Sequence, residues 1–254
     1  MIVKNINFVS KFKNANIASI ILIISSIFFI FFKGLNYGID FKGGTLIELR
    51  TEKSVNASSI RDTLNSMSLG DINVKRFGKE GDYLIKVEQK NTNNNLIPEI
   101  KKKLTENLSA EIDFRRVENV GPKVSSELLE SSIIAISLAL TAMLFYIWVR
   151  FEWQFSLGSI VALFHDVVIT LGIFSILSLE INLSIIAAVL TIVGYSMNDT
   201  VVIYDRIREN LYKYTKISIS DVTNLSVNET LARTIITSVT TLLALLSIYI
   251  LGGE

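Results

Sequence analysis

What the sequence does not contain excludes several chemistries. The chain has no cysteine, so it forms no disulfide, holds no thiolate-bound metal and uses no cysteine nucleophile. His165 is the single histidine, which excludes a metal site with several histidine ligands. A formal net charge of +1 gives no bulk electrostatic reason to bind nucleic acid or an acidic partner. The sequence shows no nucleophile–base set and no phosphate-binding loop, so we expect neither an enzyme nor a bound cofactor or metal.

Apolar residues are what the chain has in excess. The hydrophobic content is 50% and the mean hydropathy is +0.44, which is more apolar than an ordinary soluble domain. A bilayer core about 30 Å thick needs about 20 mostly apolar residues of helix. Five runs approach or exceed this length, at 17–32, 132–149, 155–178, 183–204 and 233–251. The sequence therefore predicts an α-helical polytopic membrane protein.

The first apolar run sets the orientation. It resembles a signal peptide because KFK precedes it, but no small-residue cleavage site follows, which favours an uncleaved signal anchor. Lys4, Lys11 and Lys13 lie before this run and place the N-terminus in the cytoplasm by the positive-inside rule. Residues 34–130 then lie outside, and the short RFEW turn and the basic segment 205–232 lie inside. The C-terminal LGGE is expected to emerge outside.

The outward segment has the pattern of a small α+β domain. Strand patterns occur at 45–50, 72–78, 82–90 and 110–120, and helical spacing occurs at 55–67 and 96–108. The order strand–helix–strand–strand–helix–strand predicts a ferredoxin-like sandwich. We expect three parts: 1–33 with the N-terminus and first span, 34–130 as this extracytoplasmic domain, and 131–254 with the remaining spans. No catalytic constellation is evident in the domain, which favours a binding or docking module.

Asp199 is the residue least expected where it lies. It stands in GYSMNDTVVIYDRIREN, residues 194–210, with apolar sequence on both sides. An ionisable residue inside a span costs about 2.5–3.5 kcal/mol on insertion scales and normally faces the bundle interior. Tyr195 and Asn198 lie on the same small, polar stripe of the helix, which is suited to close helix contact. We interpret these two residues as packing partners of Asp199 rather than as proton carriers.

Arg233 and Thr237 begin a second polar stripe, on the last span. Arg233 approaches the membrane from the same predicted side as Asp199, so the two side chains are expected at similar depth. An arginine remains protonated and supplies a lasting counter-charge to a carboxylate that gains and loses a proton. The pattern predicts a proton-transfer pair of Asp199 and Arg233, with a static structural ion pair as the alternative.

His165 and Asp166 lie near the middle of the third span. Asp166 is one turn from Ala162 and one turn from Thr170, on a face that can join the same interior. A transport role and a static hydrogen bond between helices remain equal alternatives for this pair. Together with Tyr195, Asn198 and Thr237 it forms the expected polar network around Asp199.

Several motifs occur in order and resemble one family. The segment 194–210 resembles the fourth-span signature of the SecF family, membrane subunits of the bacterial Sec protein-export machinery. Four further motifs match the family in sequence order: GIDFKGGTLIELR (38–50), VGPKVSSELL (120–129), ALFHDVVITLGIF (162–174) and NETLARTIITSVTTLLALL (228–246). Together they are specific, although each alone is weak.

The resemblance implies a function and partners. A SecF-type subunit pairs with SecD, resembles half of a resistance-nodulation-division transporter, and uses the proton-motive force to promote export of polypeptides across the bacterial inner membrane. The family's intramembrane aspartate and partner arginine correspond to Asp199 and Arg233. The implied partners are SecD, the SecYEG channel, YajC, the exported polypeptide and membrane lipid. The implied location of 34–130 is periplasmic.

One departure and two alternative functions remain. The family has six spans, whereas this sequence stops at Glu254 after the fifth; a sixth span beyond Glu254 is expected, with a naturally shorter protein as the alternative. A small-molecule or lipid transporter of the same superfamily is one alternative, and an apolar substrate cleft would favour it. A passive scaffold that assembles the export complex is the other.

Overall fold

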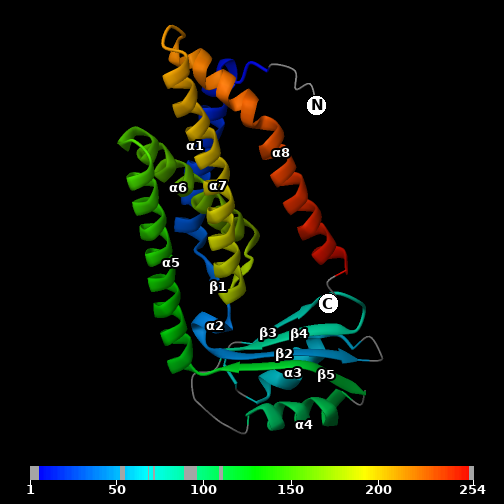
Figure 1. Cartoon of the computed structure of the whole chain (residues 1–254). Coiled ribbons are helices and arrows are strands. Elements are labelled where there is room, and N and C mark those ends of the chain that lie inside the picture. The colour runs from blue at the N-terminus through cyan, green and yellow to red at the C-terminus, as the bar shows by residue number, and fades with distance from the viewer. Residues whose placement is uncertain are drawn as a thin grey trace. The chain divides into compact units, whose positions relative to one another are not determined.

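The computed structural model describes residues 6–51, 55–67, 69–70, 72–88, 96–108 and 111–251. Within these residues, five helices are long and apolar enough to cross a membrane (Figure 1). They are α1 (Phe12–Lys33), α5 (Pro122–Arg150), α6 (Trp153–Leu177), α7 (Leu183–Lys213) and α8 (Ile219–Leu251). The chain is therefore mostly helical and polytopic, with some sheet. Lys4, the strand ends at 89–90 and 110, and residues 252–254 lie outside the described residues.

Three of these helices run well beyond the apolar runs that predicted them. α5 begins ten residues before the run at 132–149, and α8 begins at Ile219 rather than at 233. α7 continues to Lys213, so Asp205, Arg206 and Arg208 are helical. The basic segment 205–232 is therefore mostly helix. Polar residues can extend a helix beyond an apolar run where neighbouring side chains form hydrogen bonds or ion pairs with them.

The chain divides into two compact units. The helical unit comprises Met1–Leu35, Leu138–Leu179 and Ala187–Glu254, and the sheet unit comprises Asn36–Ser137 and Glu180–Ile186. The sheet unit thus includes a second segment, which runs from the α6–α7 connection into the first turn of α7 and which the sequence pattern did not indicate.

The sheet unit contains a four-stranded antiparallel sheet. Its strand order is β3 (Ile72–Arg76), β4 (Asp82–Val87), β2 (Gly44–Thr51) and β5 (Ile112–Val120). α3 (Ala57–Asn65) connects β2 to β3, and α4 (Leu96–Leu108) connects β4 to β5. Each pair of strands joined by a helix therefore has one other strand between them. From 44 to 120 the elements follow the order predicted from the sequence.

Alternation and helical spacing build the core of this unit. Ile47 and Leu49 point to one face of β2, and Tyr83, Ile85 and Val87 do the same on β4. Helices α3 and α4 each bury an apolar pair one turn apart against that face: Ile60 with Leu64, and Ile100 with Leu104.

An ion pair with a buried carboxylate joins the two central strands. Asp82 is 1% exposed and accepts hydrogen bonds from Arg50 Nε and Nη2, both at 2.5 Å. The two residues are direct partners in the register of β2 and β4. This bidentate geometry lowers the pKa of the Asp82 carboxyl below its ordinary value, chiefly through the hydrogen bond from Arg50.

A second, two-stranded sheet ties distant segments together inside the sheet unit. β1 (Asn36–Tyr37) pairs in parallel with β6 (Glu180–Ile181). Asp40 of α2 (Ile39–Lys42) accepts a hydrogen bond of 2.9 Å from the backbone N–H of Leu183, the first residue of α7. This contact caps the N-terminus of α7, where a carboxylate is favoured.

Small residues bring α1 and α6 together in the helical unit. A Cβ atom on Gly172 would lie 2.3 Å from the Ser26 Cβ and 2.8 Å from its Cα. The Ser175 hydroxyl lies within hydrogen-bond distance of two carbonyl oxygens of the α1 segment, those of Phe29 (2.9 Å) and Gly34 (2.8 Å). Close approach at small residues and hydroxyl hydrogen bonds are the main means by which membrane helices associate.

A second cluster holds α5, α6 and α7 together. Its buried members are Ile147, Phe151, Leu163, Val193 and Met197. α8 is not part of this cluster, and many of its large apolar side chains are exposed. Exposed apolar side chains are expected on a helix that faces lipid or another helix.

Candidate functional site

Asp199 lies on α7 facing α8. Its side chain is half-buried, and Asp199 Oδ1 accepts a hydrogen bond of 3.4 Å from Thr237 Oγ1 on α8. The same Thr237 hydroxyl also lies 2.9 Å from the carbonyl oxygen of Thr234 on its own helix. The contact across the two helices is therefore long and shared, which makes it weak.

A groove separates α7 from α8 at this level. Its volume is about 800 Å³. Apolar and small side chains form most of its lining, and Asp199 carries the one carboxyl group among the lining residues. The lining comprises Ala188, Thr191, Ile192, Tyr195, Ser196 and Asp199 from α7, with Thr237, Ser238, Thr241, Leu242, Ala244 and Leu245 from α8.

Arg233 does not pair with Asp199 in this structure. It lies on α8 one turn before Thr237 and is exposed. Among the described residues, no hydrogen bond or ion pair joins Arg233 to a carboxylate. Arg233 instead lines a separate cavity of about 360 Å³, together with charged residues that include Arg206 and Glu229. The sequence predicts the two residues at similar depth, and in the structure they line different cavities.

His165 and Asp166 form a polar link between α6 and α7. His165 Nδ1 lies 2.8 Å from Asp166 Oδ1. The Ser196 hydroxyl on α7 donates a 2.5 Å hydrogen bond to Asp166 Oδ2. His165 Nε2 is buried and has no partner within the described part of the chain. Because Ser196 also lines the groove, the link reaches the wall that carries Asp199.

Tyr195 and Asn198 are both exposed. Tyr195 lines the groove, whereas Asn198 is not among the groove residues. A Cβ atom on Gly194 would meet nothing within 4 Å. Among the described residues, the close helix contact expected along this stripe is therefore not formed at Gly194, and Tyr195 faces the groove instead.

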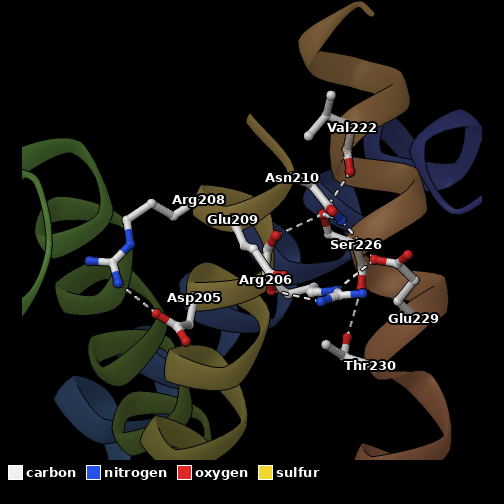
Figure 2. A network of polar contacts seen from close by, with 9 residues as sticks. All are labelled: Asp205, Arg206, Arg208, Glu209, Asn210, Val222, Ser226, Glu229 and Thr230. Atoms are coloured by element: carbon white, nitrogen blue, oxygen red, sulfur yellow. Dashed lines mark hydrogen bonds and ion pairs between the residues drawn. The ribbon is translucent and has the colours of Figure 1, made fainter. Parts of the chain in front are cut away.

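The sequence interpretation missed a polar network at the far ends of α7 and α8 (Figure 2). Arg206 and Asn210 on α7 contact Ser226 and Glu229 on α8. A basic residue such as Arg206 that directly follows an apolar run is typical of an interfacial anchor, and that pattern does not indicate a contact between helices. The signal that could have revealed the network is the density of polar residues at helical spacing in DRIREN and in SVNET.

A metal site is not apparent in the described residues. They contain no group of three or more histidine, aspartate or glutamate side chains placed to hold an ion. The polar groups that line the groove are the Asp199 carboxyl group and the hydroxyl groups of serine, threonine and tyrosine side chains.

Comparison with protein families gives two matches. The model described as "Protein export membrane protein SecD/SecF, C-terminal" matches residues 100–254. The model described as "SecD/SecF GG Motif" matches residues 28–55.

Two curated relatives show how far the similarity extends. The chain is 47% identical over 238 residues to the protein translocase subunit SecF of Rickettsia bellii, which covers 93% of this chain and 78% of that protein. It is 45% identical over 258 residues to the protein translocase subunit SecF of Calditerrivibrio nitroreducens, which covers 98% and 84% respectively.

Solved structures of SecDF share the fold. The crystal structure of SecDF from Thermus thermophilus, described as a translocon-associated membrane protein, superposes with a TM-score of 0.88 at 35% identity. A second SecDF structure, in a super-membrane-facing form, gives a TM-score of 0.70 at 34% identity. Both matches cover 100% of this chain and 35% of the solved chain. This chain therefore spans about a third of the length of those proteins.

Proposed function

The chain belongs to the SecD/SecF family of protein-export membrane proteins, as a SecF subunit of the protein translocase, and from that premise we propose that it works with SecD in proton-motive-force-coupled export of polypeptides. The proposed location is the bacterial cytoplasmic membrane, crossed several times. The partners are SecD, the SecYEG channel, YajC, the exported polypeptide and surrounding lipid. The proposal includes no catalysis, cofactor or metal.

One observation carries the proposal: a half-buried carboxylate lines a groove between two membrane helices and has one weak partner among the described residues. Asp199 accepts a single 3.4 Å hydrogen bond, from Thr237. Arg233 lies one turn from Thr237 on the opposing helix and has no described ion partner, as shown above. An ionised carboxylate in an apolar groove attracts a nearby cation strongly, whereas a protonated one does not.

The mechanism follows from this difference. When Asp199 is ionised, Arg233 approaches it and α8 closes on α7. When Asp199 binds a proton, the attraction is lost and the helices separate. Because arginine keeps its charge throughout, only the carboxylate switches. Alternating proton uptake and release then drives rigid-body rocking of the outward domain.

The outward domain and the orientation belong to the same proposal. The strand order β3–β4–β2–β5, with helices joining alternate strands, supports a ferredoxin-like domain within 34–130 that lies in the periplasm. The three lysines at positions 4, 11 and 13 support a cytoplasmic N-terminus. The domain would serve as a docking surface for exported polypeptide or for partners.

A second candidate is a transporter of small molecules or lipids. The groove favours it, because 800 Å³ of mostly apolar lining beside Asp199 could hold an apolar molecule. The first function moves a polypeptide, whereas the second moves a small molecule or lipid. A passive scaffold, by contrast, would need no proton-motive force.

The test is the Asp199→Asn variant, compared with Asp205→Asn on the same helix. Asp205 is exposed and pairs with Arg150 and Arg208, so its loss should have a small effect. We expect Asp199→Asn to abolish the uncoupler-sensitive part of export by membranes that contain SecD, and Asp205→Asn to retain it.

Three outcomes would contradict the proposal or redirect it. Undiminished uncoupler-sensitive export in Asp199→Asn removes the proton-coupled role. Export that is insensitive to uncouplers in the unmodified protein indicates a scaffold. Proton-dependent transport of a lipid or small molecule, with export unchanged by Asp199→Asn, supports the second candidate.

A further inference from the structure

Four side chains join the ends of α7 and α8, and we call them the α7–α8 clamp: Arg206, Asn210, Ser226 and Glu229 (Figure 2). Arg206 Nε donates a 2.6 Å hydrogen bond to Glu229 Oε2. Asn210 Nδ2 donates to the same oxygen at 2.7 Å and to Ser226 Oγ at 3.0 Å. All three contacts cross from α7 to α8.

One half of the clamp, Asn210 and Ser226, is shielded from solvent, whereas the side chains of Arg206 and Glu229 are about a third exposed. Asn210 is 1% exposed and Ser226 is fully buried, beside buried Val222 and Thr230. The Ser226 hydroxyl donates to the Val222 carbonyl oxygen at 2.8 Å and lies 3.4 Å from that of Arg206. Short, charge-assisted hydrogen bonds that share one carboxylate oxygen and adjoin a buried amide–hydroxyl contact hold their geometry strongly. The clamp therefore fixes α7 and α8 to each other at this point.

Beyond the clamp the same two helices are nearly free of each other. The groove of about 800 Å³ lies between them. The 3.4 Å contact between Thr237 and Asp199 is the one described side-chain hydrogen bond that crosses it. Leu242 and Leu245, on the groove wall of α8, are 56% and 59% exposed. In Figure 1 the helices meet at one end and diverge along their length.

A strong contact at one end and an open groove beyond it form a hinge. Arg233 follows Glu229 by one helical turn, so it is the first charged side chain on the free arm of α8. We propose that the α7–α8 clamp is the fixed pivot on which α8 swings toward α7 and brings Arg233 to Asp199. Glu229 and Asn210 are then positioning residues for the proton-coupled step, and this inference rests on the proposed function.

Other titratable groups lie near the clamp and near the free arm of α8. At the clamp, Glu209 accepts a 2.6 Å hydrogen bond from Arg206, but within α7. At the arm, Asp199 and Tyr195 face the groove from α7, and Asp166 on α6 reaches its wall through Ser196. Arg150 from α5 and Asp205 from α7 line the cavity that holds Arg233. Of these groups, Glu209 offers a matched control.

The experiment compares Glu229→Gln with Glu209→Gln. Both changes remove a carboxylate that binds Arg206 at 2.6 Å, but only Glu229 connects the two helices. The chain has no cysteine, so a spin label on Ala188→Cys and one on Leu245→Cys report the distance across the groove. Distance distributions are recorded on the full chain with SecD in lipid bilayers, at acidic and alkaline pH.

We expect the distance in the unmodified protein to shorten at alkaline pH, because ionised Asp199 attracts Arg233. Glu209→Gln should keep both the narrow distribution and this shift. Glu229→Gln should broaden the distribution at both pH values and lose the shift. Asn210→Ala should reproduce that result, and it carries the comparison if Glu229→Gln does not fold.

If the clamp only stabilised the fold, Glu229→Gln would lower the unfolding temperature but keep the pH-dependent shift in distance. That result would contradict the proposal that the clamp is a pivot. Equal distributions in Glu229→Gln and Glu209→Gln also overturn it. The failure of the proposed function is distinguishable: no pH-dependent shift occurs in the unmodified protein, or the shift persists in Asp199→Asn. The widths of the distributions then still decide whether the clamp is the hinge.

Discussion

Replacing Gly172 by alanine should weaken the contact between α1 and α6. The added Cβ would lie 2.3 Å from the Ser26 Cβ and Oγ and 2.8 Å from its Cα. A different rotamer of Ser26 would move its Oγ but leave its Cβ and Cα in place, so a rotamer change cannot make room. The two helices would have to separate, which also stretches the Ser175 hydrogen bonds to α1.

The magnitude follows from comparison with Gly194→Ala. A Cβ on Gly194 meets nothing within 4 Å, although Gly194 is also inside a membrane helix. Both variants gain about 0.5–1 kcal/mol from the better helix propensity of alanine, so this gain cancels in the difference. Overpacking a tight contact costs about 1–3 kcal/mol, and Gly172→Ala should be less stable than Gly194→Ala by about that amount.

Unfolding of the full chain in mixed micelles, titrated with a denaturing detergent, measures this difference. Adding Ser26→Gly to Gly172→Ala should restore part of the loss, because it removes the two atoms at 2.3 Å and leaves the Cα. Equal stability of Gly172→Ala and Gly194→Ala, or no recovery in the double variant, would refute the reasoning about the α1–α6 contact.

Three further predictions concern polar contacts. Arg50 lowers the folded-state pKa of Asp82, so the stability from this pair is complete above the unfolded-state pKa and is lost as the pH falls through the folded-state pKa. Asp82→Asn should flatten this loss of stability at acid pH, measured by hydrogen exchange of β2 and β4. An unchanged pH dependence in the variant would contradict the assignment. Ser196→Ala removes the hydrogen bond to Asp166 and should destabilise the fold by about 0.6–1.7 kcal/mol in the same micelle titration. The Thr200 hydroxyl bonds within its own helix, so Thr200→Ala should have less effect. Asn228 accepts from the N–H of Ile6 and donates to its carbonyl oxygen, both at 2.8 Å, so Asn228→Ala should accelerate amide exchange at residue 6 while Asn198→Ala leaves it unchanged.

Periodicity predicted the elements because each element is long compared with its own repeat. All five apolar runs lie within or beside a helix, and alternation located β2 and β4 to within a few residues. β1 and β6 were missed because a strand of two residues has no repeat to detect, and their pairing joins segments more than 140 residues apart. Asp40, which caps α7 from that distant segment, was missed for the same reason.

The candidate site was predictable in composition but not in arrangement. Asp199 could be singled out because it lies in an apolar run, where an ionisable side chain costs free energy and usually marks a functional site. Its distance from Arg233 depends on how far α8 diverges from α7, and no local pattern encodes that angle. The clamp was hidden for a related reason: Asn210 and Ser226 are ordinary residues of a polar segment until the two helices bury them together.

The partners of the two membrane carboxylates favour different roles for them. Asp166 uses both oxygens, at 2.8 Å to His165 and 2.5 Å to Ser196, so two short contacts hold its carboxyl group in place. Asp199 has one contact of 3.4 Å and opens on a groove. A group that must exist in two states cannot be held tightly in one of them, because a strong contact in one state opposes the change to the other. The arrangement therefore favours a static helix-joining role for His165 and Asp166, and it favours Asp199 as the carboxylate that gains and loses the proton.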